Sequence, residues 1–508
     1  MDVDLAIVGS GFGGSILALI ARRLGLRVGL LERGRHPRFA IGESSSPLAG
    51  ILLEQLADRY GLPRLKPLAA FGAWRRAYPE VVCGLKRGFT YFKHEQGRPF
   101  SVAADRANQL LVAASPNDEV SDTHWLRADV DAFLMREAVA AGVEYADEVE
   151  LDALEWTAGG LPLLKGRRQG VPFQLEARGV VDATGPRGFL SRALAIESRA
   201  FAGYPDTQAL FSHFTGVARC DEMPEYASAG LPGDAPPYPV DDAALHHVFD
   251  GGWMWVLRFG NGVTSAGVAV VDALADELTL ADGEPAWHRL LERFPSVRAQ
   301  FADARPTRRF QWMPRLSYRA AVAAGPRWAL LPSAAAFIDP LFSTGFPLTL
   351  LGIERLAPLL ESGAFFESLD AYSATTLAEA DHTARFVAGC YAGFRRFDDF
   401  VQYSMFYFAA ASYAEMARRV APERATAGFL RAADPGFASQ MRALSPGCAE
   451  PEPLAERVRD AIEPVNIAGL CVEGKRNWYG ADAADAVAGA FKLGVPPGEV
   501  AAALMPKV

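Results

Sequence analysis

The N-terminal segment constrains the fold of this chain more than any other part. Residues 4–8 form a short apolar run rich in β-formers, a glycine-rich turn follows, and residues 15–24 carry apolar side chains at helical spacing. In such a strand–turn–helix unit the glycines permit a tight turn, the close approach of a pyrophosphate and close helix packing. A second strand, residues 27–31, ends in Glu32, whose carboxylate can accept hydrogen bonds from a ribose. The unit predicts a bound dinucleotide, and its predicted contacts are Gly9, Gly11, Phe12, Gly13, Gly14 and Glu32.

Composition excludes several classes of protein. At 508 residues the chain can hold two or three domains, and its net charge of −9 gives no electrostatic footprint for nucleic acid. The five cysteines are scattered, odd in number and never in a C-x-x-C pair, so we expect neither a disulfide framework nor a metal site. No basic leader precedes the first apolar run, and no run approaches the roughly 18 residues of a membrane span. We expect a soluble, cytoplasmic protein that contacts no membrane.

Beyond the first unit, the strand and helix pattern is interrupted, which indicates a nucleotide domain built from separated segments. Residues 123–142 predict an amphipathic helix that opens near Asp129, where the preceding Arg127 either contacts the cofactor or pairs with Asp129 or Asp131. Residues 179–185 predict a strand that ends in small residues, either an ordinary strand end or a close passage over the cofactor. Between about 200 and 320, short apolar runs separated by turn residues indicate an antiparallel sheet.

From about residue 375 the pattern becomes helical. Aromatic residues recur at three- or four-residue spacing from Phe394 to Tyr407, which predicts an aromatic face on one helix. This face is either core packing or a lid over an aromatic substrate. Upstream, the turn of Ser343, Thr344 and Gly345 can present consecutive backbone N–H groups to an anion, or serve as an ordinary strand-to-helix turn.

Several ordered motifs together resemble the flavin-dependent halogenases. They span most of the chain and weaken after about residue 420; within the family they look closest to the phenolic halogenases that act on free small aromatics. The motifs are Gly9-x-Gly11-x-x-Gly14, Ile41-Gly42-Glu43-Ser44, Cys83-Gly84-Leu85-Lys86-Arg87-Gly88-Phe89, the stretch from Leu245 to Trp253, Trp253-Met254-Trp255-Val256-Leu257, and the stretch from Phe337 to Gly345.

The resemblance implies an α/β fold. The FAD-binding part would be a Rossmann-like three-layer ββα domain assembled from residues 1–75, 105–195 and 320–375. An inserted antiparallel sheet, residues 76–104 and 196–319, would form the substrate domain, and residues 376–508 a helical C-terminal lid region. A homodimer is the default expectation for a soluble enzyme.

The resemblance also implies a chemistry with two sites. Reduced FAD, delivered by a separate flavin reductase, would use dioxygen to convert chloride or bromide into hypohalous acid. The oxidant would then travel an internal tunnel to Lys86, beside a small aromatic substrate, and a dry pocket would keep it from escaping. The plain alternative for Lys86 is a solvated side chain next to Arg87 in a basic turn.

The same resemblance assigns roles to further residues. Thr344 and Gly345 would hold the halide, whereas Ser44, Arg127 and Asp339 would join the cofactor contacts. The residues expected to line the substrate pocket are Phe89, Trp255, Phe342, Phe346 and Phe400. The chain contains no second glycine fingerprint for NAD(P)H, which favours a partner reductase.

Two positions depart from the family pattern. Phe342 stands where tryptophan-directed halogenases carry a glutamate, which makes an indole less suitable and a self-activating phenol more suitable as substrate. Arg258 replaces the proline of the W-x-W-x-I-P motif, which is thought to keep substrate away from the flavin. A W-x-W pair on a strand also places both rings on one face, as ordinary core packing does.

Three other functions remain open from the residues alone. A flavin-dependent aromatic monooxygenase would leave Lys86 and the 337–345 stretch without a role. An isoprenoid-type reductase shares the Gly-Glu-Ser element, although the aromatic content favours a flat ligand. A non-catalytic flavoprotein is the third alternative, and it stays open because Arg258 replaces the proline of the family motif.

Overall fold

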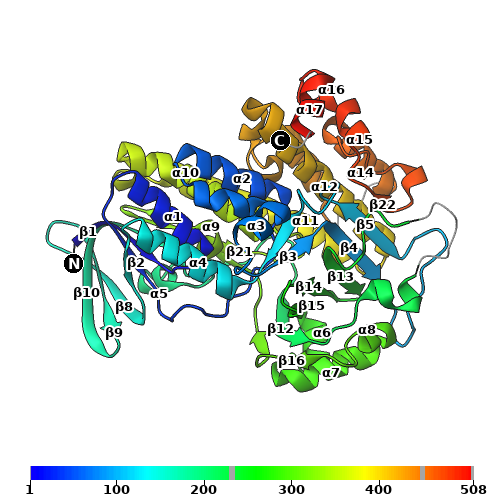
Figure 1. The fold of residues 1–508 in the computed structure, drawn as a ribbon, viewed down its shortest axis with the longest axis horizontal. Coiled ribbons are helices and arrows are strands. Elements are labelled where there is room, and N and C mark those ends of the chain that lie inside the picture. Colours follow the sequence, from blue (N-terminus) through cyan, green and yellow to red (C-terminus); the bar gives the residue numbers. More distant parts are fainter. Residues whose placement is uncertain (1, 228–234, 447–451, 505–508) are drawn as a thin grey trace.

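A computed structural model describes residues 2–227, 235–446 and 452–504 of the chain (Figure 1). The cysteine at position 448 lies outside these residues, and the other four are free thiols. Among the described residues, no helix combines the length and the apolar character needed to cross a lipid bilayer.

The first sheet has eight strands in the order β19-β20-β10-β1-β2-β7, with β8 and β9 continuing from β10. Pairing along β20, β10, β1, β2 and β7 is parallel, as the βαβ pattern of the N-terminal segment requires. The strands are β1 (Asp2–Val8), β2 (Val28–Leu31), β7 (Glu144–Ala146), β8 (Val149–Trp156), β9 (Pro162–Arg168), β10 (Val171–Asp182), β19 (Ala324–Gly325) and β20 (Trp328–Leu330).

Helices from distant parts of the sequence cover this sheet and one another (Figure 1). The helix α1 (Phe12–Arg23) packs on α4 (Arg127–Ala140) and on α10 (Gly345–Ser362), and α10 packs on α2 (Pro47–Arg59). Smaller helices nearby are α3 (Phe71–Ala77), α5 (Phe189–Ala193) and α9 (Pro332–Ala335). The helix predicted to open near Asp129 begins at Arg127, and the residues before it, 122–125, form a strand.

The second sheet has nine strands in the order β16-β12-β15-β14-β13-β4-β5-β22, with β17 also paired to β12. The strands are β4 (Gly88–Lys93), β5 (Gln109–Ala113), β12 (Thr207–Thr215), β13 (Ala244–Phe249), β14 (Gly252–Arg258), β15 (Thr264–Val271), β16 (Arg305–Pro306), β17 (Gln311–Met313) and β22 (Trp478–Tyr479). Most of the pairs are antiparallel, but β4 pairs with β13, and β5 with β22, in parallel.

The two faces of this second sheet belong to different cores. Trp253 and Trp255 of β14 pack into the large core, whereas Met254 and Val256 of the same strand join a second core. That second core is covered by α6 (Asp272–Glu277), α7 (Glu284–Arg293) and α8 (Pro295–Gln300). Alternation along one strand therefore decides which side chains face the rest of the molecule.

Two strands belong to a different part of the molecule from the one expected from their position in the predicted domains. The strand β5 was expected in the nucleotide domain and β22 in a helical region, but both belong to the nine-stranded sheet. Strand propensity is local, whereas the choice of partner strand is made by tertiary packing. The division of the chain into three parts otherwise stays a prediction.

The C-terminal region begins with two long helices, α11 (Asp370–Gly393) and α12 (Phe397–Val420), which pack on each other. The predicted single aromatic helix is wrong at its start, because Phe394 follows the end of α11. Gly393 marks this break, since a β-carbon there would lie 2.5 Å from the backbone nitrogen of Phe400. Further helices follow: α13 (Pro435–Ala443), α14 (Leu454–Ile462), α15 (Ala483–Ala488), α16 (Ala490–Leu493) and α17 (Pro497–Leu504).

Two small sheets join the larger parts. The strands β3 (Cys83–Lys86) and β6 (Asp122–Trp125) form an antiparallel pair that carries Lys86. The strands β11 (Ser198–Arg199), β18 (Tyr318–Ala320) and β21 (Ala336–Phe337) form the other small sheet. A β-carbon on Gly84 would lie 1.8 Å from the carbonyl oxygen of Arg258, so β3 sits directly against the end of β14.

Candidate active site

A cavity of about 850 Å³ is walled by residues of both large sheets and of α9, α1 and α10. Twelve predicted site residues line it: Gly9, Gly11, Phe12, Gly13, Glu32, Ser44, Arg127, Trp255, Asp339, Thr344, Gly345 and Phe346. Five predicted residues are outside its lining: Gly14, Lys86, Phe89, Phe342 and Phe400. The first group comes from segments that lie hundreds of residues apart in the sequence.

The glycine turn has the shape that a pyrophosphate cradle requires. Gly9 has φ +99°, and a β-carbon there would lie 2.7 Å from the carbonyl oxygen of Ala183. Gly11 is the N-cap of α1, and the first turn of this helix carries no acidic residue, so its free N–H groups can meet an anion. Gly14 acts through packing, because a β-carbon there would lie 1.9 Å from the carbonyl oxygen of Gly9.

Glu32 is held as a carboxylate at the end of β2. Its Oε1 accepts from the Gly34 N–H at 2.9 Å, and its Oε2 accepts from Ser10 Oγ and Arg38 Nη2, both at 2.9 Å. Burial alone would raise the pKa of Glu32, but the charge of Arg38 and the hydrogen bonds outweigh it and lower the pKa to about 2. A fixed, ionised acceptor therefore stands on the cavity wall.

Arg127 lines the cavity, and its side chain also connects two segments of the cavity wall. Its guanidinium donates two bonds to Asp131, each of 2.9 Å, and further bonds to the carbonyl oxygens of Ile41 and Gly42. Its guanidinium carbon also lies 5.0 Å from the ring centre of Phe12. The predicted pairing with Asp131 is therefore present, and the arginine joins α4 to the 41–44 segment.

Asp339 sits between two tyrosines. Its Oδ2 accepts from Tyr391 Oη at 2.8 Å and from Tyr204 Oη at 3.1 Å, while Oδ1 accepts from the Leu341 N–H. Burial raises the pKa of Asp339 to about 7, although these hydrogen bonds work in the opposite direction. Neither tyrosine was predicted, because each comes from a segment far from residue 339.

The turn before α10 places a helix N-terminus on the cavity wall. Ser343 has φ +57°, and Thr344 is the N-cap of the helix that begins at Gly345. A β-carbon on Gly345 would meet nothing within 4 Å, so this backbone faces open space. Phe346 in the first turn stacks on Phe12 at 4.4 Å, which ties the turn to the glycine cradle.

Lys86 is buried in the interior directly behind this turn. Its Nζ donates to Ser343 Oγ at 3.3 Å and to the carbonyl oxygen of Ser45, and it lies 4.0 Å from the ring centre of Phe89. The side chain is fully buried, so the solvated-lysine alternative is wrong. Burial lowers the pKa of Lys86, and the nearby carboxylate of Asp122 raises it in part.

The predicted substrate-pocket residues fall into two groups. Trp255 and Phe346 line the large cavity, whereas Phe89, Phe342 and Phe400 are packed against other rings on the side of Lys86. Phe342 stacks on Tyr407 at 4.0 Å, and Phe89 lies 5.2 Å from Phe408. The aromatic face of α12 thus forms core around Lys86, as the first of the two interpretations predicts.

His246 is a cavity-lining residue to which the sequence interpretation gave no role. It stacks on Tyr91 at 4.4 Å, and its Nδ1 lies 3.0 Å from the carbonyl oxygen of Thr90. Alternation along β13 is the signal that could have found it, because Ala244 and His246 share the face on which the cavity opens.

The arginine that replaces the motif proline does not enter the cavity. Arg258 Nε donates to Asp241 Oδ1 at 2.9 Å, and Nη1 donates to the carbonyl oxygen of Val217. Trp253, Trp255 and Leu257 line the cavity on the other face of the same strand. The strand alternation turns the charge of residue 258 away from the cofactor region.

Arg258→Ala is therefore expected to lower stability and leave product chemistry unchanged. It removes the partner of the fully buried Asp241 carboxylate, which costs about 2–4 kcal/mol. Arg98→Ala serves as the control, since its exposed pair with Glu95 contributes under about 1 kcal/mol. Urea unfolding measures both costs, and mass spectrometry of the products checks the chemistry. A product from Arg258→Ala that differs in kind from the wild-type product would contradict this placement.

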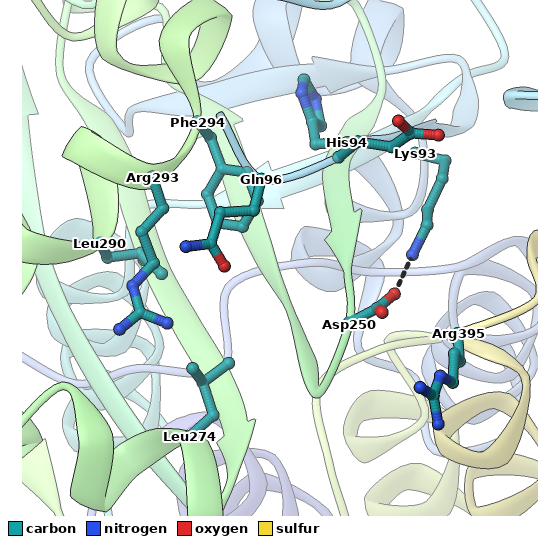
Figure 2. Close-up of a pocket in the computed structure, with 10 residues that line it drawn as sticks. Lys93, His94, Gln96, Asp250, Leu274, Leu290, Arg293, Phe294 and Arg395 are labelled. Atoms are coloured by element: carbon teal, nitrogen blue, oxygen red, sulfur yellow. Dashed lines mark hydrogen bonds and ion pairs between the residues drawn. The ribbon is translucent and has the colours of Figure 1, made fainter. Parts of the chain in front are cut away.

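A second cavity of about 310 Å³ shares no residue with the first (Figure 2). It is lined in part by Lys93, Arg293 and Arg395, and Lys93 Nζ donates to Asp250 Oδ1 at 2.6 Å. This cavity has less than half the volume of the first and contains none of the predicted site residues. The large cavity is therefore the one whose size and glycine cradle fit a dinucleotide.

Comparisons with known proteins agree with this site. The family described as "Tryptophan halogenase" matches residues 104–431. Monodechloroaminopyrrolnitrin halogenase PrnC of Pseudomonas fluorescens is 30% identical over 407 residues, covering 78% of this chain and 68% of that protein. Tetracycline 7-halogenase of Kitasatospora aureofaciens is 31% identical over 355 residues, covering 68% of this chain and 61% of that protein. The chain thus spans less than two thirds of the second relative.

Solved structures show the same fold. The L111Y mutant of halogenase PltM in complex with FAD superposes with a TM-score of 0.81 at 23% identity, over 93% of this chain and 99% of that one. PltM in complex with phloroglucinol and FAD gives a TM-score of 0.79 at 24% identity, with the same two shares covered. Since the family match covers more than half of the chain and a relative at 30% identity extends over most of it, this protein belongs to the flavin-dependent halogenases.

Proposed function

We propose that the protein chlorinates or brominates an electron-rich phenolic small aromatic, using reduced FAD, dioxygen and Lys86. One observation carries the proposal: Lys86 Nζ donates to Ser343 Oγ at 3.3 Å, in the turn that opens α10 on the wall of the large cavity. A buried amine and the cofactor cradle are thereby connected through one side chain. The family relationship favours this function over the isoprenoid-type reductase and the non-catalytic flavoprotein.

The residues of the large cavity fit FAD. Gly9, Gly11 and Gly13 would take the pyrophosphate at the N-terminus of α1, and Glu32 would accept from the adenosine ribose. Ser44, Arg127, Asp339 and Phe12 would complete the cradle. When bound in reduced form, FAD supplies with dioxygen the oxidising equivalents that turn a halide into hypohalous acid.

The halide would lie at the start of α10. Thr344 and Gly345 present N–H groups that have no acceptor within the helix, and no acidic side chain occupies its first turn. An anion there would be held by backbone dipoles at the wall of the cavity. Ser343 would then mark the boundary between the halide and Lys86.

Lys86 would act in a dry, aromatic interior. Its Nζ donates to two acceptor oxygens and lies over the ring of Phe89. Such a site would keep hypohalous acid from bulk water beside the amine. Phe342 stacks on Tyr407 instead of offering a carboxylate, which suits a phenol that supplies its own electron density.

The test is turnover of purified protein with FAD, a generic flavin reductase and NADH, on a panel of phenols, in chloride and again in bromide. One phenylpyrrole joins the panel because PrnC is named for monodechloroaminopyrrolnitrin. Mass spectra should show halogen isotope patterns on at least one phenol. A product with added oxygen and no halogen would instead support the aromatic monooxygenase, and halogenation of the phenylpyrrole alone would refute the phenolic assignment.

Flavin-dependent halogenases typically draw reduced flavin from a separate reductase. We expect the same here, so omission of the reductase should stop turnover even when NADH is present. Photochemically reduced FAD should restore it. Consumption of NADPH by the chain alone, coupled to product formation, would contradict this dependence.

A further inference from the structure

Asp122 lies opposite Lys86 in the two-stranded sheet. The strands β3 and β6 are antiparallel, and their register pairs Lys86 directly with Asp122. Directly opposed residues in an antiparallel pair project from the same face, with β-carbons about 5 Å apart. Both side chains are buried, and Asp122 Oδ2 has no hydrogen-bond partner.

The ionisable groups around this pair leave Lys86 and Asp122 as each other's main electrostatic partner. From α12, Glu415 and Arg419 act on Asp122 with opposite signs, and Tyr407 interacts with the same carboxylate. His124 and His246 lie close enough to Lys86 to sense its charge, and burial lowers the pKa of each to about 3, so both are neutral. Those neutral imidazoles add no counter-charge.

We propose that Asp122 is the positioning residue that sets the protonation of Lys86, the two groups sharing a single proton. This inference rests on the proposed role of Lys86. The two side chains are buried on the same face of the sheet and form no direct ion pair within 4.0 Å. This burial makes the neutral amine and carboxylic acid accessible alongside the charged pair. Asp122 thus receives the proton that the lysine loses, inside the protein.

The chemistry balances with this proton. The ammonium of Lys86 passes H⁺ to the carboxylate of Asp122, which leaves a neutral amine. The amine nitrogen then attacks the halogen of hypohalous acid, so that an N–halogen bond forms and the O–halogen bond breaks. The displaced hydroxide takes a proton from the same nitrogen and leaves as water. As the halogen passes to the ring carbon and the N–halogen bond breaks, the Asp122 acid returns its proton to the nitrogen, which gives the amine. The amine then takes the proton that the ring loses, so that the ammonium of Lys86 and the carboxylate of Asp122 are restored.

The first test compares pH–rate profiles of halogenation by the wild type, Asp122→Asn and Asp118→Asn. Loss of the Asp122 charge disfavours the ammonium of Lys86 and lowers the pKa of this lysine. The limb of the pH–rate profile that reports this pKa should therefore move to lower pH by about one unit or more. Asp118 pairs with Arg87 at the surface, so its variant should keep the wild-type limb. Asp122→Glu, which restores a carboxylate, should move the limb back. An unmoved limb in Asp122→Asn overturns the proposal.

The second test measures the energetic coupling between Asp122 and Lys86 and does not require turnover. Melting temperatures are measured for Asp122→Asn in the wild-type background and in a Lys86→Met background. The substitution should lower the melting temperature in the wild type, where it leaves a buried lysine without its partner. It should raise it in Lys86→Met, where it removes an unpaired buried acid. Equal shifts in the two backgrounds overturn the proposal even if Asp122→Asn folds poorly.

The two tests separate this inference from the proposed function. If the wild type yields no halogenated product, the proposed function fails. The melting temperatures of the variants still show whether Asp122 and Lys86 are coupled. If halogenation is found and Asp122→Asn shifts the melting temperature equally in both backgrounds, only the proposed role of Asp122 is refuted.

Discussion

Lys86→Ala is expected to abolish carbon–halogen bond formation, by about 10³-fold or more, while FAD still binds. Lys86 is outside the lining of the cofactor cavity, so its removal leaves the glycine cradle and Glu32 in place. Oxidation of reduced flavin by dioxygen should continue and release peroxide. Product is measured by mass spectrometry and flavin binding by fluorescence titration.

Two further variants make the Lys86 result specific. Lys86→Met keeps the side-chain volume over the ring of Phe89 and removes only the amine, so it should be as inactive as alanine but more stable. Lys93→Ala removes a lysine that bonds to Asp250, and it should keep most of the activity. Loss of bound flavin in Lys86→Met would show that the lysine serves the cofactor site instead.

Gly14→Ala is expected to destroy flavin binding and to destabilise the fold by more than about 3 kcal/mol. Its β-carbon would lie 1.9 Å from the carbonyl oxygen of Gly9, which is backbone and cannot turn away. The helix α1 would have to move off β1, and the cradle formed by Gly9 and Gly11 would open. Thermal melting and FAD titration measure the two effects.

Gly159→Ala is the matched control for this variant. Gly159 lies in the exposed turn between β8 and β9, and its nearest neighbour to an added β-carbon is Thr157 Oγ1 at 3.8 Å. It should keep wild-type flavin affinity and melting temperature. Wild-type affinity in Gly14→Ala would mean that the close packing of α1 on the turn is not what forms the cradle.

The parts of the site that the sequence predicts are those built within one local unit. The turn from Gly9 to Gly14 and the acid Glu32 belong to one strand–turn–helix–strand segment, whose geometry follows from glycine conformations and apolar periodicity. Both rings of the W-x-W pair likewise share one face, because side chains alternate along any strand. Alternation also places Arg258 on the opposite face.

Contacts between distant segments could not be derived in this way. The tyrosines at Asp339, the stacking of Phe342 on Tyr407 and the pairing of β22 with β5 each join residues that are not neighbours in sequence. Local propensity has no information about such partners, since they are chosen by the packing of whole elements.

The sequence by itself determined the dinucleotide cradle, the likeness to the flavin-dependent halogenases and the identity of Lys86 as the amine to examine. Only the tertiary structure decided that this lysine is buried, hydrogen-bonded to Ser343 and opposed to Asp122. The physical reason is that the sequence specifies the chemical type of each side chain. Its burial, charge and partners, in contrast, depend on elements brought together from three separate segments.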